Sequence, residues 1–222
     1  MNNQETSVDE VQQFVKKHYK ALIIVIVLLI VGFGSFFQVG TEEEGVVTRF
    51  GKHVRTVVPG LKMKIPYIEE VYKVPVERQQ KQEFGFRTQQ AGVRTQYSRT
   101  GSVTEDEAIM LTGDLNLANV QWVVQYRVSD PYNYLFMVRN PDNTLRDLSE
   151  AVTRQIVGDR TVNEVLTVGR AEIASEVKVL LQEMAREYSL GIEIAQVVLQ
   201  DINPPESVKQ AFNAVNEAQQ ER

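Results

Sequence analysis

The sequence contains no cysteine and only two histidines, His18 and His53. The absence of cysteine excludes disulfides, thiolate metal sites and cysteine nucleophiles. A zinc site would need carboxylates as its main ligands, and a Ser–His–Asp triad would have to use His53, because His18 lies beside a long apolar segment. The glycine-rich phosphate loop, the dinucleotide fingerprint and the G-x-S-x-G nucleophile motif are also missing from the sequence. We therefore assign no catalytic, cofactor-binding or metal-ligating residue.

Basic residues are not in excess: 24 Lys and Arg stand against 29 Asp and Glu, giving a formal net charge of −5 over 222 residues. Nucleic-acid binding needs a basic surface that neutralises phosphates, so the composition argues against a nucleic-acid partner. The length is sufficient for one or two domains with a buried core. A dense acidic run, Glu105-Asp106-Glu107, directs consecutive side chains apart. We interpret it as a solvated loop.

Residues 21–37 form one uncharged apolar block, ALIIVIVLLIVGFGSFF. Extended to residue 39, a helix at about 1.5 Å per residue would match the hydrocarbon core of a bilayer. We predict a transmembrane helix over residues 21–39 that includes Ala21, Ile26, Leu29, Phe33 and Phe37. A cleaved signal peptide is the alternative, but the apolar run is unusually long for one and no A-x-A-like cleavage site follows it.

The charges on either side of this block predict its orientation. Lys16, Lys17 and Lys20 precede it, whereas residues 42–44 are all glutamate. Lysines determine topology and glutamates contribute little, so residues 1–20 are expected in the cytoplasm. The bulk of the chain would then lie in the periplasm of a bacterium. The prediction is a single-pass protein of the inner membrane, in contact with its lipids.

After the apolar block, the pattern predicts strands over residues 45–50, 61–65 and 70–76, and long polar loops over about 85–106. The clearest strand signal alternates apolar residues on one face: Val120, Trp122, Val124, Tyr126 and Val128. Leu115 and Leu117 have the opposite parity, which predicts a bulge or break at Ala118-Asn119. We expect Trp122 to be a core residue.

Helices are predicted downstream. Asn140-Pro141 can begin a helix that ends at Gly158, and Thr161 with Glu164 matches a capping box. A longer helix runs from about Ile173 to Tyr188, and residues 192–202 are again β-rich.

Residues 204–222 are expected to begin a long helix. Val208, Ala211, Val215 and Ala218 are spaced 3, 4 and 3 residues apart, which is a heptad spacing typical of an oligomer seam. No Gly or Pro ends this segment, so we expect the helix to continue beyond Arg222. A frayed tail with a chance spacing is the alternative.

Several motifs resemble a known family. Glu43-Glu44-Gly45-Val46-Val47, Phe50-Gly51, Val58-Pro59-Gly60-Leu61 and Ile65-Pro66 resemble the opening of the SPFH (band 7) domain, shared by stomatin, prohibitin, flotillin and the bacterial HflK/HflC pair. Downstream, residues 110–114 (MLTGD), 124–131 (VQYRVSDP), 157–160 (VGDR), 169–173 (GRAEI) and 199–205 (LQDINPP) are similar to the HflK branch. The resemblance covers about residues 42–222.

This resemblance implies an α+β fold: a transmembrane helix, a two-part SPFH body and the start of a C-terminal coiled-coil helix. The two parts would be a β-rich subdomain over 42–105 and an α/β subdomain over 106–203. Family members of the HflK and HflC types alternate in a ring that forms a periplasmic cage around the protease FtsH and limits its access to substrates. The implied partners are therefore an HflC-type paralogue and FtsH.

The function implied by the resemblance is that of a non-enzymatic membrane scaffold subunit. A stomatin-like organiser of membrane microdomains or channels is an alternative from the same family. A membrane-tethered hydrolase is a third, because any two of the 29 acidic residues could converge in the fold.

Overall fold

The computed structural model describes residues 20, 23, 32, 34–90, 96–98, 106–166 and 169–203. Most of the predicted membrane-spanning residues and the whole predicted seam lie outside the described residues: Ala21, Ile26, Leu29, Phe33, Val208, Ala211, Val215 and Ala218. Within the part that is described, no helix combines the length and the apolar character needed to cross a membrane. The chain divides into two compact units, Met1–Pro75 (unit 1) and Val76–Arg222 (unit 2).

Unit 1 is built on a three-stranded antiparallel sheet. β2 (Glu43–Arg49) lies in the centre, between β3 (Lys52–Val57) and β5 (Glu69–Pro75). Val46 and Val47 of β2 are fully buried, because the central strand is covered most completely. The strands predicted at 45–50 and 70–76 are confirmed as β2 and β5.

A second, two-stranded ribbon corrects the end of the predicted membrane helix. β1 (Phe36–Val39) pairs antiparallel with β4 (Gly60–Met63), and Phe37 lies opposite Lys62. Residues 36–39 were predicted to be helical because they extend the apolar run. They are extended instead, because aromatic and β-branched residues accept a pleated backbone and β4 supplies hydrogen-bond partners. Phe37 is therefore a strand residue, and any membrane helix must end before Phe36.

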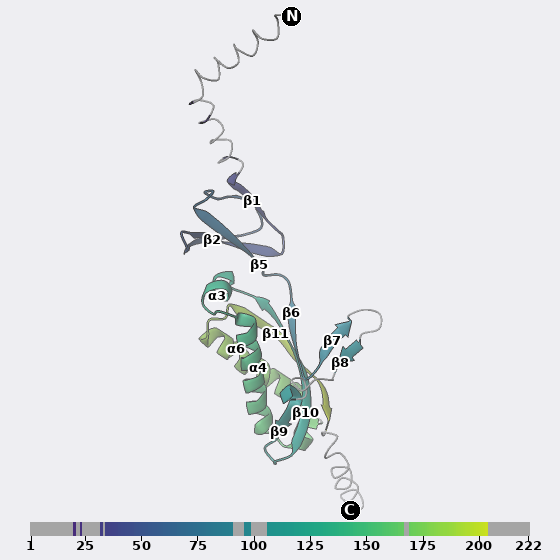
Figure 1. The fold of residues 1–222 in the computed structure, drawn as a ribbon. Helices are drawn as coiled ribbons and strands as arrows, with labels where there is room; N and C mark the ends of the chain where they lie inside the picture. Colours follow the sequence, from purple (N-terminus) through teal and green to yellow (C-terminus); the bar gives the residue numbers. More distant parts are fainter. Residues whose placement is uncertain are drawn as a thin grey trace, which may run out of the picture. The chain divides into compact units, whose positions relative to one another are not determined.

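Unit 2 contains a larger antiparallel sheet with the order β11–β10–β6, in which β9 also pairs with β10. The long central strand β10 (Leu117–Val128) pairs along its length with β11 (Ile192–Asn203). β6 (Gln80–Phe84) and β9 (Ile109–Leu111) pair with different parts of β10. Figure 1 shows these strands beside α4 and α6.

The division between the two units differs from the expected boundary at 105/106. The chain divides after Pro75, because β6 pairs with β10 and so belongs to the later sheet. The polar stretch that was predicted to form loops also contains a hairpin, made by β7 (Arg87–Gln90) and β8 (Gln96–Ser98). Its strands are polar and short, so their sequence carries no apolar alternation.

The predicted break at Ala118-Asn119 is wrong. Ala118 is buried on the same face as Val120 and Trp122, whereas Leu117 is 40% exposed and Leu115 has a positive φ of 62° in the preceding turn. The apparent change of phase arose because Leu115 and Leu117 are apolar but face outwards. The register shifts of β10 against β11 lie further along, between Val120 and Trp122 and between Gln125 and Tyr126.

The helices follow the predicted pattern closely. α3 (Pro131–Phe136) comes directly after β10, and α4 (Pro141–Gly158) is capped by the Asn140 side chain. α5 (Val162–Leu166) begins with the predicted capping box, in which the Thr161 amide donates to Glu164 at 2.8 Å. α6 (Arg170–Glu187) leads through a short turn into β11.

The core of unit 2 lies between this sheet and helices α4 and α6. Trp122 is fully buried, as predicted; its ring stacks on Phe84 at 4.5 Å and its indole N–H donates to Ser149 of α4. Leu145, Ile173 and other apolar residues of the helices complete the cluster.

Candidate functional site

The histidine that a triad would have required lies on a strand of unit 1. His53 of β3 is partly buried, and its Nε2 lies 3.2 Å from the Thr56 hydroxyl. Among the described residues, no group of three or more His, Asp or Glu side chains is arranged to hold a metal ion. The surfaces that stand out are an exposed apolar tip on unit 1 and a polar groove on unit 2.

The apolar tip consists of large side chains on neighbouring turns of unit 1. Phe50 and Tyr67 occupy loop ends with positive φ angles of 51° and 65°, and they are 84% and 88% exposed. The two loops are adjacent, because the Phe50 amide donates to the Ile68 carbonyl. We define the apolar tip as Phe36, Phe50, Met63, Ile65, Tyr67 and Ile68, all of which are exposed. Bulky residues rarely adopt positive φ, so Phe50 and Tyr67 are held in an unusual backbone conformation that leaves both rings exposed.

A buried carboxylate holds these loops in place. Glu69, whose side chain is 1% exposed, accepts hydrogen bonds from Arg49 at 2.8 Å and from both terminal nitrogens of Arg55 at 3.0 Å. It also accepts from the Ile65 amide at 3.0 Å. Arg55 additionally donates to the Met63 carbonyl. The cluster therefore fixes the backbone that presents the apolar tip.

The same hydrogen bonds strongly favour the charged form of the Glu69 carboxylate. The Arg55 hydrogen bonds, followed by those from Arg49 and Ile65, lower the pKa of Glu69 to about 2. These bonds favour the charged form enough to outweigh the cost of burying it. Sequence reasoning missed this cluster, because Arg49, Arg55 and Glu69 come from three different strands.

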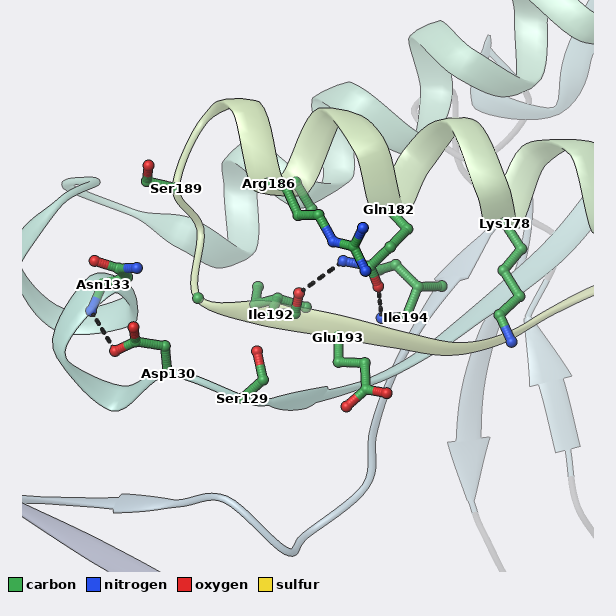
Figure 2. A pocket seen from close by; sticks show the side chains of 12 residues that line it. Ser129, Asp130, Asn133, Lys178, Gln182, Arg186, Ser189, Ile192, Glu193 and Ile194 are labelled. Carbon is green, nitrogen blue, oxygen red and sulfur yellow. Dashed lines mark hydrogen bonds between the residues drawn. The ribbon is translucent and has the colours of Figure 1, made fainter.

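The groove on unit 2 lies where β10 ends and α6 turns into β11. It has a volume of about 570 Å³ and is lined from α6 by Lys178, Gln182 and Arg186. Figure 2 shows these side chains reaching from α6 towards β11, with Ser129, Asp130 and Asn133 on the opposite side of that strand.

Gln182 bridges the groove to the edge of the sheet. Its side-chain nitrogen donates to the Ile192 carbonyl at 3.3 Å, and its side-chain oxygen accepts from the Ile194 amide at 2.7 Å (Figure 2). A neighbouring strand would make the same pair of bonds. Gln182 therefore occupies part of the open edge of β11, which otherwise would offer a template for aggregation.

The end of the groove is built by the Ser129-Asp130-Pro131 motif and a glycine. Asp130 caps α3 by accepting from the Tyr132 and Asn133 amides at 3.0 and 3.1 Å. The Ser129 and Asp130 amides both donate to the carbonyl of Gly191, which has a φ of +66°. A Cβ atom at Gly191 would lie 2.3 Å from the Asp130 carbonyl oxygen, so only glycine allows this close approach.

Two of the motifs that resemble the HflK branch, residues 110–114 and 157–160, contact each other. The Gly113 amide donates to the Arg160 carbonyl at 2.8 Å, and a Cβ at Gly113 would lie 2.8 Å from the Gly158 carbonyl. Asp114 accepts from the Thr112 hydroxyl and from the Val162 amide at the start of α5. These contacts, the Thr112 bond foremost, lower the pKa of Asp114. These two motifs therefore hold the turn after β9 against the end of α4 and the start of α5.

The acidic run interpreted as a solvated loop needs a correction. Glu105 lies outside the described residues and Asp106 is exposed, but Glu107 is only 7% exposed. It binds Arg87 at 2.8 Å and Arg146 at 3.2 Å, and it accepts from the Gly85 amide. This carboxylate can be buried because Arg87 of β7 and Arg146 of α4 neutralise its charge. Both arginines are remote in the sequence, so the local sequence does not predict the pairing.

Comparison with known proteins agrees with this architecture. The SPFH domain / Band 7 family profile matches residues 37–222. "Protein HflK" of Treponema pallidum is 42% identical over 197 residues, which cover 87% of this chain and 59% of that protein. "Protein HflK" of Borreliella burgdorferi is 36% identical over 217 residues, covering 96% and 68% respectively.

A further relative carries a functional name. The "Modulator of FtsH protease HflK" of Escherichia coli is 36% identical over 187 residues, which cover 84% of this chain but 39% of that protein. The chain thus spans between about two fifths and two thirds of the length of these relatives. The profile match, the high identity and the mixed α/β body together show that the chain belongs to the SPFH domain / Band 7 family.

Proposed function

We propose that the chain is a non-enzymatic, membrane-anchored scaffold subunit that regulates a membrane AAA protease of the FtsH type. Its relatives are named HflK, and one is named a modulator of FtsH protease. The described motif residues cap and join elements within the subunit, which supports a structural role for these motifs. An HflC-type paralogue is the proposed partner in a ring or cage that limits the access of substrates to the protease.

The observation that carries the membrane part of the proposal is the apolar tip. Phe36 and Met63 face each other across β1 and β4, and Phe36 lies near the end of the apolar block of residues 21–37. We propose that residues from Ala21 up to the start of β1 form the anchor and that the tip rests in the bilayer interface. Tyr is enriched at this depth because its ring is apolar and its hydroxyl is polar, and Tyr67 supplies such a side chain to the tip. The amino terminus would be cytoplasmic, and the strands of unit 1 and the whole of unit 2 would be periplasmic.

Assembly is proposed to continue beyond the two units. The heptad positions Val208, Ala211, Val215 and Ala218 would form the seam of a long helix that packs against neighbouring subunits. Anchoring many subunits in one bilayer makes membrane residence effectively permanent.

A tryptophan scan tests the membrane contact. In proteoliposomes that contain brominated lipids, we expect Tyr67→Trp fluorescence to be quenched at least twofold, because this side chain is 88% exposed at the tip. The signal of the buried Trp122 is subtracted using the unsubstituted chain. Tyr188→Trp, at a position that is 52% exposed in unit 2, is the control and should keep its intensity. Equal quenching at both positions would contradict a membrane-facing tip.

A reconstituted degradation assay tests the function itself. The chain, an HflC-type partner and an FtsH-type protease are placed in the same vesicles, and the degradation rates of a membrane-embedded and a soluble substrate are compared. We expect the membrane substrate to be degraded several-fold more slowly when the chain is present, with the soluble substrate unaffected. The reason is that a ring in the membrane blocks only those substrates that reach the protease through the bilayer.

Co-purification from detergent extracts provides the second readout of the same proposal. The chain should be recovered with both the protease and the paralogue. A chain that remains monomeric, binds neither partner and leaves both degradation rates unchanged would refute the scaffold proposal.

A further inference from the structure

The apolar tip of unit 1 lies directly beside the end of the apolar block. The Lys64 amide donates to the Ser35 carbonyl at 2.7 Å. A Cβ at Gly34 would lie 3.3 Å from the Pro66 side chain, so the loop after β4 also lies against the last residues of the block. These contacts fix the tip at the level at which an anchor formed by the block would leave the hydrocarbon core.

The strand β4 exposes its apolar side chains and partly covers its lysine. Leu61 and Met63 are 70% and 63% exposed, whereas Lys62, and Lys64 directly after the strand, are half-buried. Successive side chains of a strand point to opposite faces, so Lys62 lies on the other face from Leu61 and Met63. A strand surrounded by water would expose its lysine instead. The observed order suits a strand whose outer face lies on an apolar phase.

Three lysines lie at the same end of unit 1 as the apolar tip: Lys52, Lys62 and Lys64. Lys52 is exposed; it begins β3 directly after the turn that contains Phe50, and it lies opposite Arg49 of β2. None of the three lysines makes a side-chain ion pair or hydrogen bond with another described residue. Their positive charges are therefore not neutralised by the described part of the chain.

The acidic residues at this end do not cancel these charges. Glu69 is bound by both Arg49 and Arg55, so this cluster itself carries one net positive charge. Glu70 is exposed and supplies one further negative charge. The glutamates of residues 42–44 lie at or before the opposite end of β2, because Glu43 pairs with the last residue of β5 and Arg49 with the first. Among the described residues at the tip, cations therefore exceed anions.

We infer that the tip binds the headgroups of anionic phospholipids, with Lys52, Lys62 and Lys64 contacting the phosphates and the apolar side chains reaching the acyl chains. The inference rests on the proposed function, because it names the lipid class at the membrane contact proposed above. A lysine ammonium binds phosphate as a point charge, and its stem can lie along apolar surface while the charge reaches a headgroup. Each lysine near an anionic surface strengthens the attraction about fivefold.

Lipid-selective quenching tests the inference on the whole chain carrying Tyr67→Trp. The chain is reconstituted in vesicles of phosphatidylglycerol and phosphatidylcholine in equal amounts, with bromine on the acyl chains of only one of the two lipids. The signal of Trp122 is subtracted using the chain without the substitution. We expect brominated phosphatidylglycerol to quench about twofold more strongly, or better, than brominated phosphatidylcholine. This preference should shrink at high ionic strength, because salt screens exposed charges.

Substitutions connect the preference to the lysines. Lys52→Gln, Lys62→Gln and Lys64→Gln combined should make the two lipids quench equally, whereas arginine at all three positions should keep the preference, because arginine retains the charge. Lys64→Gln alone should reduce the preference. Lys73→Gln is its matched control and should have no effect, because Lys73 is exposed on β5 opposite Gly45, away from the tip.

Two kinds of failure can be told apart. Equal quenching by the two lipids in the Tyr67→Trp chain, or a preference that survives the three glutamine substitutions, would overturn the inference and leave the membrane contact of the tip intact. The absence of quenching by either lipid would contradict that membrane contact itself, and the inference with it.

Discussion

Replacing Gly191 by alanine is expected to lower the free energy of unfolding of unit 2 by about 3–5 kcal/mol. The backbone at this position has a φ of +66°, which an alanine adopts at a cost of roughly 1–2 kcal/mol. The added Cβ would also lie 2.3 Å from the Asp130 carbonyl oxygen and 2.6 Å from the Tyr134 nitrogen. Both contacts are to backbone, so relief requires moving the start of α3.

The measurement is urea unfolding followed by the fluorescence of Trp122, which is fully buried in unit 2 and is the single tryptophan of the chain. Gly158→Ala is the matched control. Its Cβ would meet nothing closer than 3.9 Å at the end of α4, so we expect a gain of up to about 1 kcal/mol. Equal stabilities for the two variants would show that the close approach at Gly191 is unimportant.

Acidification is expected to destabilise unit 1 through Glu69. Hydrogen bonds from Arg55 and Arg49 hold the pKa of Glu69 at about 2 in the folded state, against an ordinary value of 4.5 in the unfolded chain. The folded-state pKa is the lower one, so this contribution to stability is complete above about pH 4.5 and is lost as the pH falls towards 2. Because both arginines are at least one third exposed and therefore screened, we expect a loss of about 2 kcal/mol.

Hydrogen exchange of the β2, β3 and β5 amides at pH 5 and pH 2.5, corrected for intrinsic rates, measures this loss. Glu69→Gln should lower protection at pH 5 by a similar amount and remove most of the difference between the two pH values. Glu70→Gln is the control, since that neighbouring side chain is exposed and bonded only by Tyr72 among the described residues. An unchanged pH response in Glu69→Gln would mean that other carboxylates govern the acid sensitivity.

Features set by neighbours along the chain were predictable. The capping box at Thr161 and Glu164, the N-cap at Asn140 and the burial of Trp122 all follow from short-range spacing, and each is confirmed. Family membership was also predictable, because the motifs occur in a fixed order along the sequence. Phe37 marks where local reasoning failed, since its apolar character suits a membrane helix and a strand equally well.

The candidate surfaces were much less predictable. Glu107 was interpreted as part of a solvated loop because the side chains of consecutive acidic residues were expected to diverge, yet β7 and α4 bring it two arginines. The apolar tip depends on Phe50 and Tyr67, which are 17 residues apart and meet only through adjacent loops. The membrane helix and the C-terminal seam remain predictions, since nearly all of their residues lie outside the described ranges.

The sequence alone thus determined most of the strands and helices, the helix starts at Asn140 and Thr161, and the family, because these depend on side-chain periodicity and on contacts within a few residues. Only the tertiary structure decided which charges are neutralised: the buried carboxylates of Glu69 and Glu107 obtain arginine partners from distant strands and helices, whereas Lys178 and Arg186 obtain none among the described residues. The interaction between two charged side chains depends on the distance between them. For side chains on remote segments, that distance is set by how the sheet and the helices pack.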